Sequence, residues 1–350
     1  MPQRTSLIAV LVASMVSGCS PSPNASVPNA AAAARSVGPH VHVVCPTAAI
    51  SVDCAFAGGS GIQAAIDAAA DGDTVQLRAG TYTPTAVRDV PYKIHTIRGF
   101  VVVDGKRLSL AGEPGVVLDG GTGPRTTGIV VRRANLEVRG LTLTGFKFDV
   151  EEDEIYEGHG IFAIDSRVRL HDVTIEKYQK MGLTGRGDTI LDVDGLRILD
   201  GHVAIWLHET AYLRLTNAVI RGNDSSGIAA YDNATAHVAH SVFDRNIDDA
   251  LYSEHEASIY ATNSIFLNNK PYVARAVGNS RIWIGYSSLF GNEHAMLAKD
   301  AATVRKGSNV IEQDPRLDAD YRQQPQSPLA GKGDPDFGSP AGSPSQIGLR

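Results

Sequence analysis

The stretch that decides the fold is Asn217-Ala-Val-Ile-Arg-Gly-Asn223, because it returns twice along the chain. It recurs as His240-Ser-Val-Phe-Asp-Arg-Asn246 and again as Asn263-Ser-Ile-Phe-Leu-Asn-Asn269. The asparagines that close these segments lie 23 residues apart, and the series continues to Asn292. A fixed period of this length predicts a stacked solenoid, in which each repeat contacts only its neighbours.

Two short strand patterns alternate from about residue 100 to residue 300. The first pattern pairs a small residue with an aliphatic one, and it starts at Gly128, Gly160, Gly182, Ala204, Gly227 and Ala250. The second pattern alternates apolar and polar residues, and it starts at Leu136, Val168, Leu191, Leu213, His237 and Ile259. Starts of the first pattern lie 32, 22, 22, 23 and 23 residues apart. This spacing predicts an all-β fold with three short strands in each coil of about 22 or 23 residues.

The segment that precedes these repeats reads as a cap. Its apolar residues fall at helical spacing, at Ile62, Ala65, Ile66 and Ala69. A turn at Asp71-Gly72 and an alternating strand over 74–77 follow. The stretch from Gly61 to Tyr82 resembles the N-terminal cap of right-handed parallel β-helix proteins of the pectate-lyase-like superfamily. The resemblance implies a right-handed parallel β-helix with a short capping helix, and it leaves the activity open because that superfamily contains lyases, hydrolases, epimerases and non-catalytic proteins.

We expect five segments along the chain. They are a signal peptide (1–18), a flexible tether (19–39), an N-terminal cap (40–84), the parallel β-helix (85–310) and a C-terminal closing segment (311–350). The tether is small, polar and Pro-rich, so it cannot bury a core. The closing segment resembles the one that is common in β-helix repeat proteins.

The first residues resemble a bacterial lipoprotein signal. Arg4 precedes a short apolar run, Leu7–Val16, which is too short to span a membrane as a mature helix. The run ends in Ser17-Gly18-Cys19, which is similar to a lipobox. The resemblance implies an exported lipoprotein that is lipidated at Cys19 and touches the membrane only through this anchor. Ser20 then favours the outer membrane, on its periplasmic or its cell-surface side; a plain secretory signal is the alternative.

Composition and cysteine count limit the partners and the compartment. The chain is 43% hydrophobic and 20% charged, as in ordinary globular proteins, and its net charge of −6 excludes nucleic acid as a natural partner. We expect a monomer. Apart from Cys19, the cysteines are Cys45 and Cys54; in an oxidising compartment they form either a disulfide or two buried thiols.

An acidic insertion interrupts the regular spacing between Gly128 and Gly160. Its densest part is Glu151, Glu152, Asp153 and Glu154. Insertions in solenoids form loops on one face, which is often the binding face. The four carboxylates predict either a solvated loop or a calcium site.

Strand alternation sorts the remaining polar residues onto one outward face. Counting from the small residue of each coil predicts that Trp206 and Tyr252 point outward, next to a row formed by Arg186, His208, Tyr231 and Glu254. Neighbouring coils lie about 4.8 Å apart, so these side chains should be adjacent. The alternative is the polar outer face of an ordinary solenoid.

This row suggests carbohydrate chemistry. Arg186 can neutralise a uronate carboxylate, His208 can remove the proton at C5, and Tyr231 can donate to the leaving oxygen. Trp206 and Tyr252 can stack on sugar rings. We therefore expect a protein that binds or processes polysaccharide. Uronate-containing polymers are the favoured ligands, and β-elimination is the expected reaction if the protein is an enzyme. The alternatives are a non-catalytic carbohydrate-binding protein and a structural cell-surface protein.

Two further motifs resemble those of polygalacturonases, Gly158-His159-Gly160 and Asp248-Asp249. Their order along the chain is the reverse of that family's, and four coils place them about 19 Å apart. One glycosidic bond needs its carboxylates within about 10 Å of each other. We therefore interpret His159 as a loop residue and Asp248 and Asp249 as turn residues. The turn column Asn217, His240 and Asn263 predicts a ladder of side-chain hydrogen bonds between adjacent coils, and we interpret the 23-residue asparagine series as structural as well.

Overall fold

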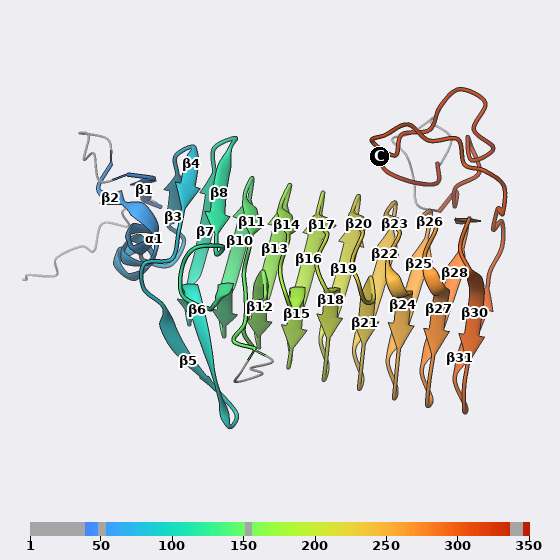
Figure 1. Cartoon of the computed structure of the whole chain (residues 1–350), viewed down its shortest axis with the longest axis horizontal. Helices are drawn as coiled ribbons and strands as arrows, with labels where there is room; N and C mark the ends of the chain where they lie inside the picture. Colours follow the sequence, from blue (N-terminus) through green and yellow to red (C-terminus); the bar gives the residue numbers. More distant parts are fainter. Residues whose placement is uncertain (1–38, 48–53, 151–155, 337–345) are drawn as a thin grey trace, which may run out of the picture. The chain divides into compact units, whose positions relative to one another are not determined.

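The computed structural model describes residues 39–47, 54–150, 156–336 and 346–350. In the body Pro39–Arg350, each coil adds one strand to each of three parallel sheets, here called A, B and C (Figure 1). The chain passes from sheet C to sheet A to sheet B and back to sheet C. The predicted all-β fold with three strands per coil is therefore confirmed.

Sheet A contains β2 (Phe56–Ala57), β1 (Val41–Cys45), β3 (Thr74–Leu77), β7 (Arg107–Gly112), β10 (Asn135–Arg139), β13 (Arg167–His171), β16 (Ile190–Asp194), β19 (Tyr212–Thr216), β22 (Thr235–Ala239), β25 (Ser258–Thr262), β28 (Arg281–Gly285) and β31 (Thr303–Lys306). Sheet B contains β4 (Gly80–Tyr82), β8 (Val116–Asp119), β11 (Thr142–Thr144), β14 (Thr174–Glu176), β17 (Arg197–Leu199), β20 (Val219–Arg221), β23 (Val242–Asp244), β26 (Ile265–Leu267) and β29 (Ser288–Phe290).

Sheet C contains β5 (Arg88–Tyr92), β6 (His95–Asp104), β9 (Thr127–Arg132), β12 (Ile161–Ile164), β15 (Met181–Arg186), β18 (Val203–Leu207), β21 (Ile228–Ala230), β24 (Ile247–Ser253), β27 (Lys270–Ala276) and β30 (His294–Ala298). Strands β5 and β6 form an antiparallel hairpin at the N-terminal end of this sheet, whereas the later strands of sheet C pair in parallel.

The inward side chains form aliphatic columns along the solenoid. In sheet C the column is Ile129, Ile161, Leu183, Ile205, Ile228 and Leu251, paired in register and fully buried. These residues are the aliphatic members of the first sequence pattern. A parallel sheet needs apolar residues of this kind because one face of every strand lies in the core.

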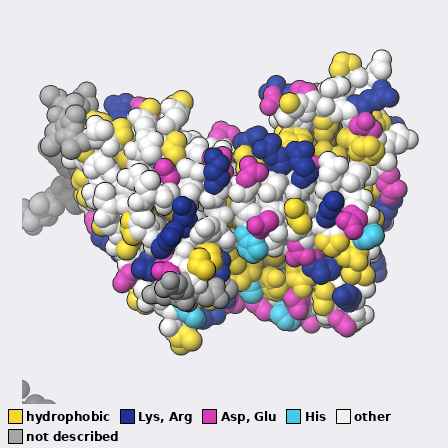
Figure 2. Space-filling model, viewed as in Figure 1, with side chains coloured by type: hydrophobic (Ala, Val, Ile, Leu, Met, Phe, Trp, Pro, Cys, Tyr) yellow, Lys and Arg dark blue, Asp and Glu magenta, His cyan; other side chains and the backbone are white. Residues whose placement is uncertain are grey.

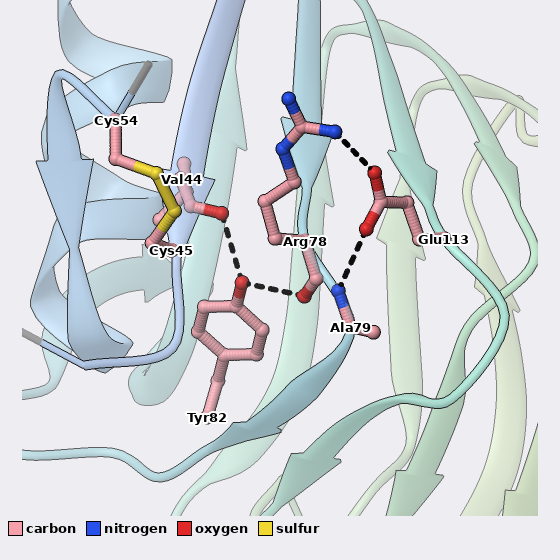
Figure 3. The surroundings of a disulfide bond; sticks show 7 residues. All are labelled: Val44, Cys45, Cys54, Arg78, Ala79, Tyr82 and Glu113. Atoms are coloured by element: carbon pink, nitrogen blue, oxygen red, sulfur yellow. Dashed lines mark hydrogen bonds and ion pairs between the residues drawn. A yellow bond between two sulfur atoms is a disulfide. The ribbon is translucent and has the colours of Figure 1, made fainter. Parts of the chain in front are cut away.

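The N-terminal cap closes the first coil. Helix α1 (Gly58–Ala68) buries Ile62, Ala65 and Ile66 against the core, as the helical spacing predicts. Cys45 and Cys54 form a disulfide with Cα atoms 5.8 Å apart. Beside it, the Tyr82 hydroxyl lies within hydrogen-bond distance of two backbone carbonyls, which ties β4 to β1 (Figure 3).

An asparagine ladder runs along the turns between sheets B and C. The Nδ2 atom of Asn223 donates to Oδ1 of Asn246 over 2.8 Å, and Asn246 donates in the same way to Asn269 over 3.0 Å. Asn269 continues the series to Asn292 over 2.9 Å. The 23-residue series is therefore structural, as predicted. In the column for which the sequence predicted a ladder, Asn263 Nδ2 lies 3.3 Å from His240 Nε2, whereas Asn217 donates to Asp194 instead.

The C-terminal segment covers the outward face of sheet B. Tyr321, Leu329 and Ile347 pack on a column of apolar side chains that includes Val242 and Ile265. The Tyr321 hydroxyl also donates to Asp244 in β23 over 2.7 Å. In the described part of the chain, no helix combines the length and the apolar character that crossing a membrane requires.

Two predictions concern residues outside the described part of the chain, and a third prediction is wrong. Cys19 and the predicted ligands Glu151, Glu152, Asp153 and Glu154 lie outside the described residues. Asp248 and Asp249 are not turn residues, because both belong to β24. The sequence interpretation missed this because the small-aliphatic pair that marks the strand comes after them.

Candidate functional site

The outward face of sheet C brings the predicted row together. Thr184, Trp206, Ala229, Tyr252 and Arg275 pair in register as one outward column across β15, β18, β21, β24 and β27. Arg186 ends β15, and His208, Tyr231 and Glu254 directly follow β18, β21 and β24, where their backbone N–H groups bond the preceding coil; these four residues form the next column. Figure 2 shows acidic, basic, histidine and hydrophobic side chains interspersed where these strands lie.

The aromatic rings of this face contact one another. His208 stacks on Tyr231 with ring centroids 4.4 Å apart, and the Trp206 and His208 rings form a T-shaped pair with centroids also 4.4 Å apart. Tyr252 continues the series at 5.6 Å from Tyr231. Trp206 is only 8% exposed, whereas Tyr231 and Tyr252 are partly exposed. The two tyrosines are therefore the rings that a ligand can reach.

Arg186 is occupied by an ion pair. Its Nε and Nη2 atoms donate to Glu209 over 3.0 and 3.1 Å, and its side chain is 9% exposed. Lys93, at the tip of the β5–β6 hairpin, also donates to Glu209 over 2.6 Å. Burial alone would raise the pKa of Glu209, but the hydrogen bonds from Arg186 and Lys93 lower this pKa to about 2. A substrate carboxylate would have to displace Glu209 to reach Arg186.

His208 is half-buried and uncharged. Its Nδ1 atom lies 3.2 Å from Asp232, and its Nε2 atom has no hydrogen-bond partner among the described residues. Burial and the nearby Arg186 lower the pKa of His208 to about 4. The imidazole is therefore uncharged at neutral pH and only weakly basic.

A second charged cluster lies two coils further along, where Arg275, which the sequence reasoning did not single out, joins Asp248 and Asp249. Nε of Arg275 donates to Asp249 over 2.6 Å, and Nη2 donates to Asp248 over 3.0 Å. Asp249 is fully buried and its Oδ1 has no partner within the described residues. Burial raises the pKa of Asp249 to about 7. The 23-residue period could have found Arg275, which follows Tyr252 by that distance.

The phenols of this face are hydrogen-bond donors. The Tyr252 hydroxyl donates to Glu254 over 2.7 Å, and the Arg275 guanidinium lies 4.9 Å from the Tyr252 ring. Burial raises the pKa of Tyr231 to about 12, and it also raises that of Tyr252. Both hydroxyls therefore stay protonated at neutral pH and neither is suited to act as a base.

The two polygalacturonase-like motifs remain apart. His159 lies in a loop, as predicted, but it is fully buried, and its Nδ1 lies 2.9 Å from the Thr184 hydroxyl. The strands between His159 and Asp249 are β15, β18 and β21, in line with the predicted distance of four coils. Among the described residues, no group of three or more His, Cys, Asp or Glu is placed to hold a metal ion.

Comparisons with known proteins address the fold. A family model described as right handed beta helix region matches residues 127–288. No curated protein sequence matches the chain significantly. Among solved structures, the pectate lyase Pel9A is 11% identical with a TM-score of 0.52, covering 89% of this chain and 96% of that chain.

Two further solved structures have lower TM-scores. An alginate lyase from Paenibacillus sp. is 14% identical with a TM-score of 0.42, covering 75% of this chain and 99% of that chain. An exopolygalacturonase from Yersinia enterocolitica is 12% identical with a TM-score of 0.41, covering 78% and 79%. The sheets, the family model and Pel9A together give this chain the fold of a right-handed parallel β-helix protein.

Proposed function

We propose that the protein binds polysaccharide along the outward face of sheet C. The observation that carries the proposal is the pair of partly exposed rings, Tyr231 and Tyr252, in adjacent coils beside Glu254 and Arg275. An aromatic ring packs against the C–H face of a sugar, and the polar groups beside it bond the sugar hydroxyls. The likeness to a pectate lyase concerns the fold alone, so the proposal depends on these side chains.

Uronate recognition in this proposal belongs to Arg275 and not to Arg186. The Arg275 side chain is 25% exposed, against 9% for Arg186. A uronate carboxylate can approach the exposed edge of Arg275 and compete with Asp248, whose side chain is itself partly exposed. Guanidinium groups bind carboxylates through two parallel hydrogen bonds, which favours this pairing.

Cleavage of a glycosidic bond is the second candidate function, favoured by the Asp248–Arg275–Asp249 cluster. A buried carboxyl with a pKa of about 7 beside a second carboxylate is the arrangement that acid–base chemistry uses. Asp248 would be the group that meets the substrate, because Asp249 is fully buried. Elimination through His208 is less favoured, because its pKa of about 4 makes it a weak base.

The test is a panel of uronate and neutral polysaccharides applied to the whole protein. We expect retention of a uronate polymer, weakened in Arg275→Gln, with no ultraviolet absorbance from an unsaturated product. New reducing ends that disappear in Asp248→Asn would establish the second candidate. An unsaturated product that disappears in His208→Ala would restore elimination. If the protein neither retains a polymer nor forms a product, a structural cell-surface protein is the remaining alternative.

We also propose export and attachment through a lipid on Cys19, and calcium binding by residues 151–154. The motif Ser17-Gly18-Cys19 and the four carboxylates support these two proposals. A labelled fatty acid should enter the wild-type protein and not Cys19→Ser. Calcium should raise the melting temperature of the wild-type protein more than that of a variant in which the four carboxylates are replaced by amides.

A further inference from the structure

A groove lies on the outward face of sheet A, away from the rings of sheet C. Its volume is about 400 Å³, and residues from β19, β22, β25 and β28 line it together with Asp334 of the C-terminal segment. The lining is largely apolar. Solvent-exposed grooves with an apolar lining and a few polar groups are the usual form of a small-ligand site.

Aromatic rings form one wall of this groove. His237, Tyr260 and Trp283 occupy one register column, and the first two rings stack with centroids 5.0 Å apart. The Trp283 indole lies against Gly285 and Gly307, where an added Cβ would come within 2.4 and 2.6 Å of the ring. Glycine is therefore required at both positions for the indole to lie where it does.

A buried hydroxyl without a partner lies on the floor of the groove. The floor is the next outward column, formed by Thr216, Ala239, Thr262 and Gly285. Thr262 is 5% exposed, and its Oγ1 has no hydrogen-bond partner within the described residues. An unpaired buried hydroxyl costs free energy unless a ligand bonds it, so this atom indicates a ligand with hydroxyl groups.

The charges of the groove match an uncharged ligand. Arg214 is neutralised by Asp192, with its Nε and Nη2 atoms 2.9 and 2.7 Å from the carboxylate. Burial lowers the pKa of His237, so its imidazole is neutral at neutral pH. The acidic side chain of Asp334 is part of the lining, which disfavours an anionic ligand.

We propose that this groove is a second carbohydrate-binding site, which takes neutral sugar units through ring stacking on Tyr260 and Trp283 and a hydrogen bond to Thr262. It differs from the sheet C face in location and in charge, and it does not depend on polysaccharide binding there. The two tryptophans of the chain, Trp206 and Trp283, lie one on each face, so each can report on its own surface.

The test is a fluorescence titration of the whole protein carrying Trp206→Phe, in which Trp283 is the one tryptophan and is excited selectively over the tyrosines. Neutral oligosaccharides of hexoses and pentoses should produce a saturable change, and uronate oligosaccharides should not. Tyr260→Ala in the same background should weaken binding at least tenfold. Thr262→Val should weaken it about fivefold without lowering the stability of the free protein, because it removes an unpaired hydroxyl and keeps the shape.

Two outcomes would overturn the proposal. One is the absence of a saturable signal with every neutral oligosaccharide up to about 10 mM, confirmed by calorimetry on the wild-type protein. The other is binding that Tyr260→Ala and Thr262→Val leave unchanged. Tyr252→Ala on the sheet C face should leave this titration unaffected, so failure of one site is distinguishable from failure of the other.

Discussion

The outward faces of sheets B and C belong to the same coils and serve different purposes. On sheet B the outward column is aliphatic, with Val219, Val242 and Ile265, and the C-terminal segment covers it. On sheet C the corresponding positions hold rings and charges, with Tyr252 and Arg275 partly exposed. Aliphatic side chains gain most from a permanent cover, whereas amphipathic rings tolerate water until a ligand arrives.

The difference separates residues that stabilise the solenoid from residues that are free for a ligand. On sheet B, the covering C-terminal segment supplies a hydrogen-bond partner for a side chain of the sheet, because the Tyr321 hydroxyl donates to Asp244. Among the described residues, His208 Nε2 and Asp249 Oδ1 on sheet C have no hydrogen-bond partner, and on sheet B Ser288 Oγ has none either. The groups of sheet C that a ligand can reach are therefore its partly exposed side chains, Tyr252 and Arg275, and not these buried atoms.

The largest effect should come from breaking the cover on sheet B. Ile347→Asp places a carboxylate in a fully buried apolar site, so we expect a loss of at least ~4 kcal/mol of unfolding free energy. Ile94→Asp is the matched control, because Ile94 is 94% exposed. Chemical denaturation measures both. An equal, small effect of the two substitutions would mean that the C-terminal segment does not stabilise the coils.

The asparagine ladder should come next. Asn269→Ala removes the amide that bonds Asn246, Asn292 and the Phe243 carbonyl, so we expect a loss of about 3 kcal/mol. Asn279→Ala removes an exposed amide in a neighbouring coil and should cost little. Thermal unfolding of the two variants checks this. A ladder that contributes nothing would show the same melting temperature in both.

The pH dependence should reveal the buried carboxyl on sheet C. Because burial raises the pKa of Asp249 to about 7, the folded state prefers the protonated form, and its stabilising effect is lost as the pH rises from 3.8 toward 7. Asp249→Asn should therefore gain about 2 kcal/mol relative to the wild-type protein between pH 5 and pH 7. Denaturation at both pH values measures the difference. A pH-independent difference would mean that Asp249 has an ordinary pKa.

The sequence predicts the scaffold well because the scaffold repeats. The aliphatic columns, the asparagine ladder and the capping helix each follow from spacing or periodicity. Strand alternation and the 22- or 23-residue period also predict that Arg186, His208 and Tyr231 lie side by side, and the structure brings these three residues together.

The chemistry of the row could not be read from spacing. Glu209 lies in a turn, and Lys93 comes from a hairpin that is more than a hundred residues earlier in the chain. These two groups decide whether Arg186 is free. Burial, which lowers the pKa of His208 and raises that of Asp249, depends on the same long-range packing.

The most direct test of the account is polysaccharide retention by Tyr252→Ala compared with Phe290→Ala. Both residues are accessible aromatics, but Tyr252 lies on sheet C and Phe290 lies on sheet B. We predict that Tyr252→Ala weakens retention about fivefold, or about 1 kcal/mol, and that Phe290→Ala leaves it unchanged. Equal retention by the wild-type protein and both variants would contradict the assignment of sheet C as the binding face.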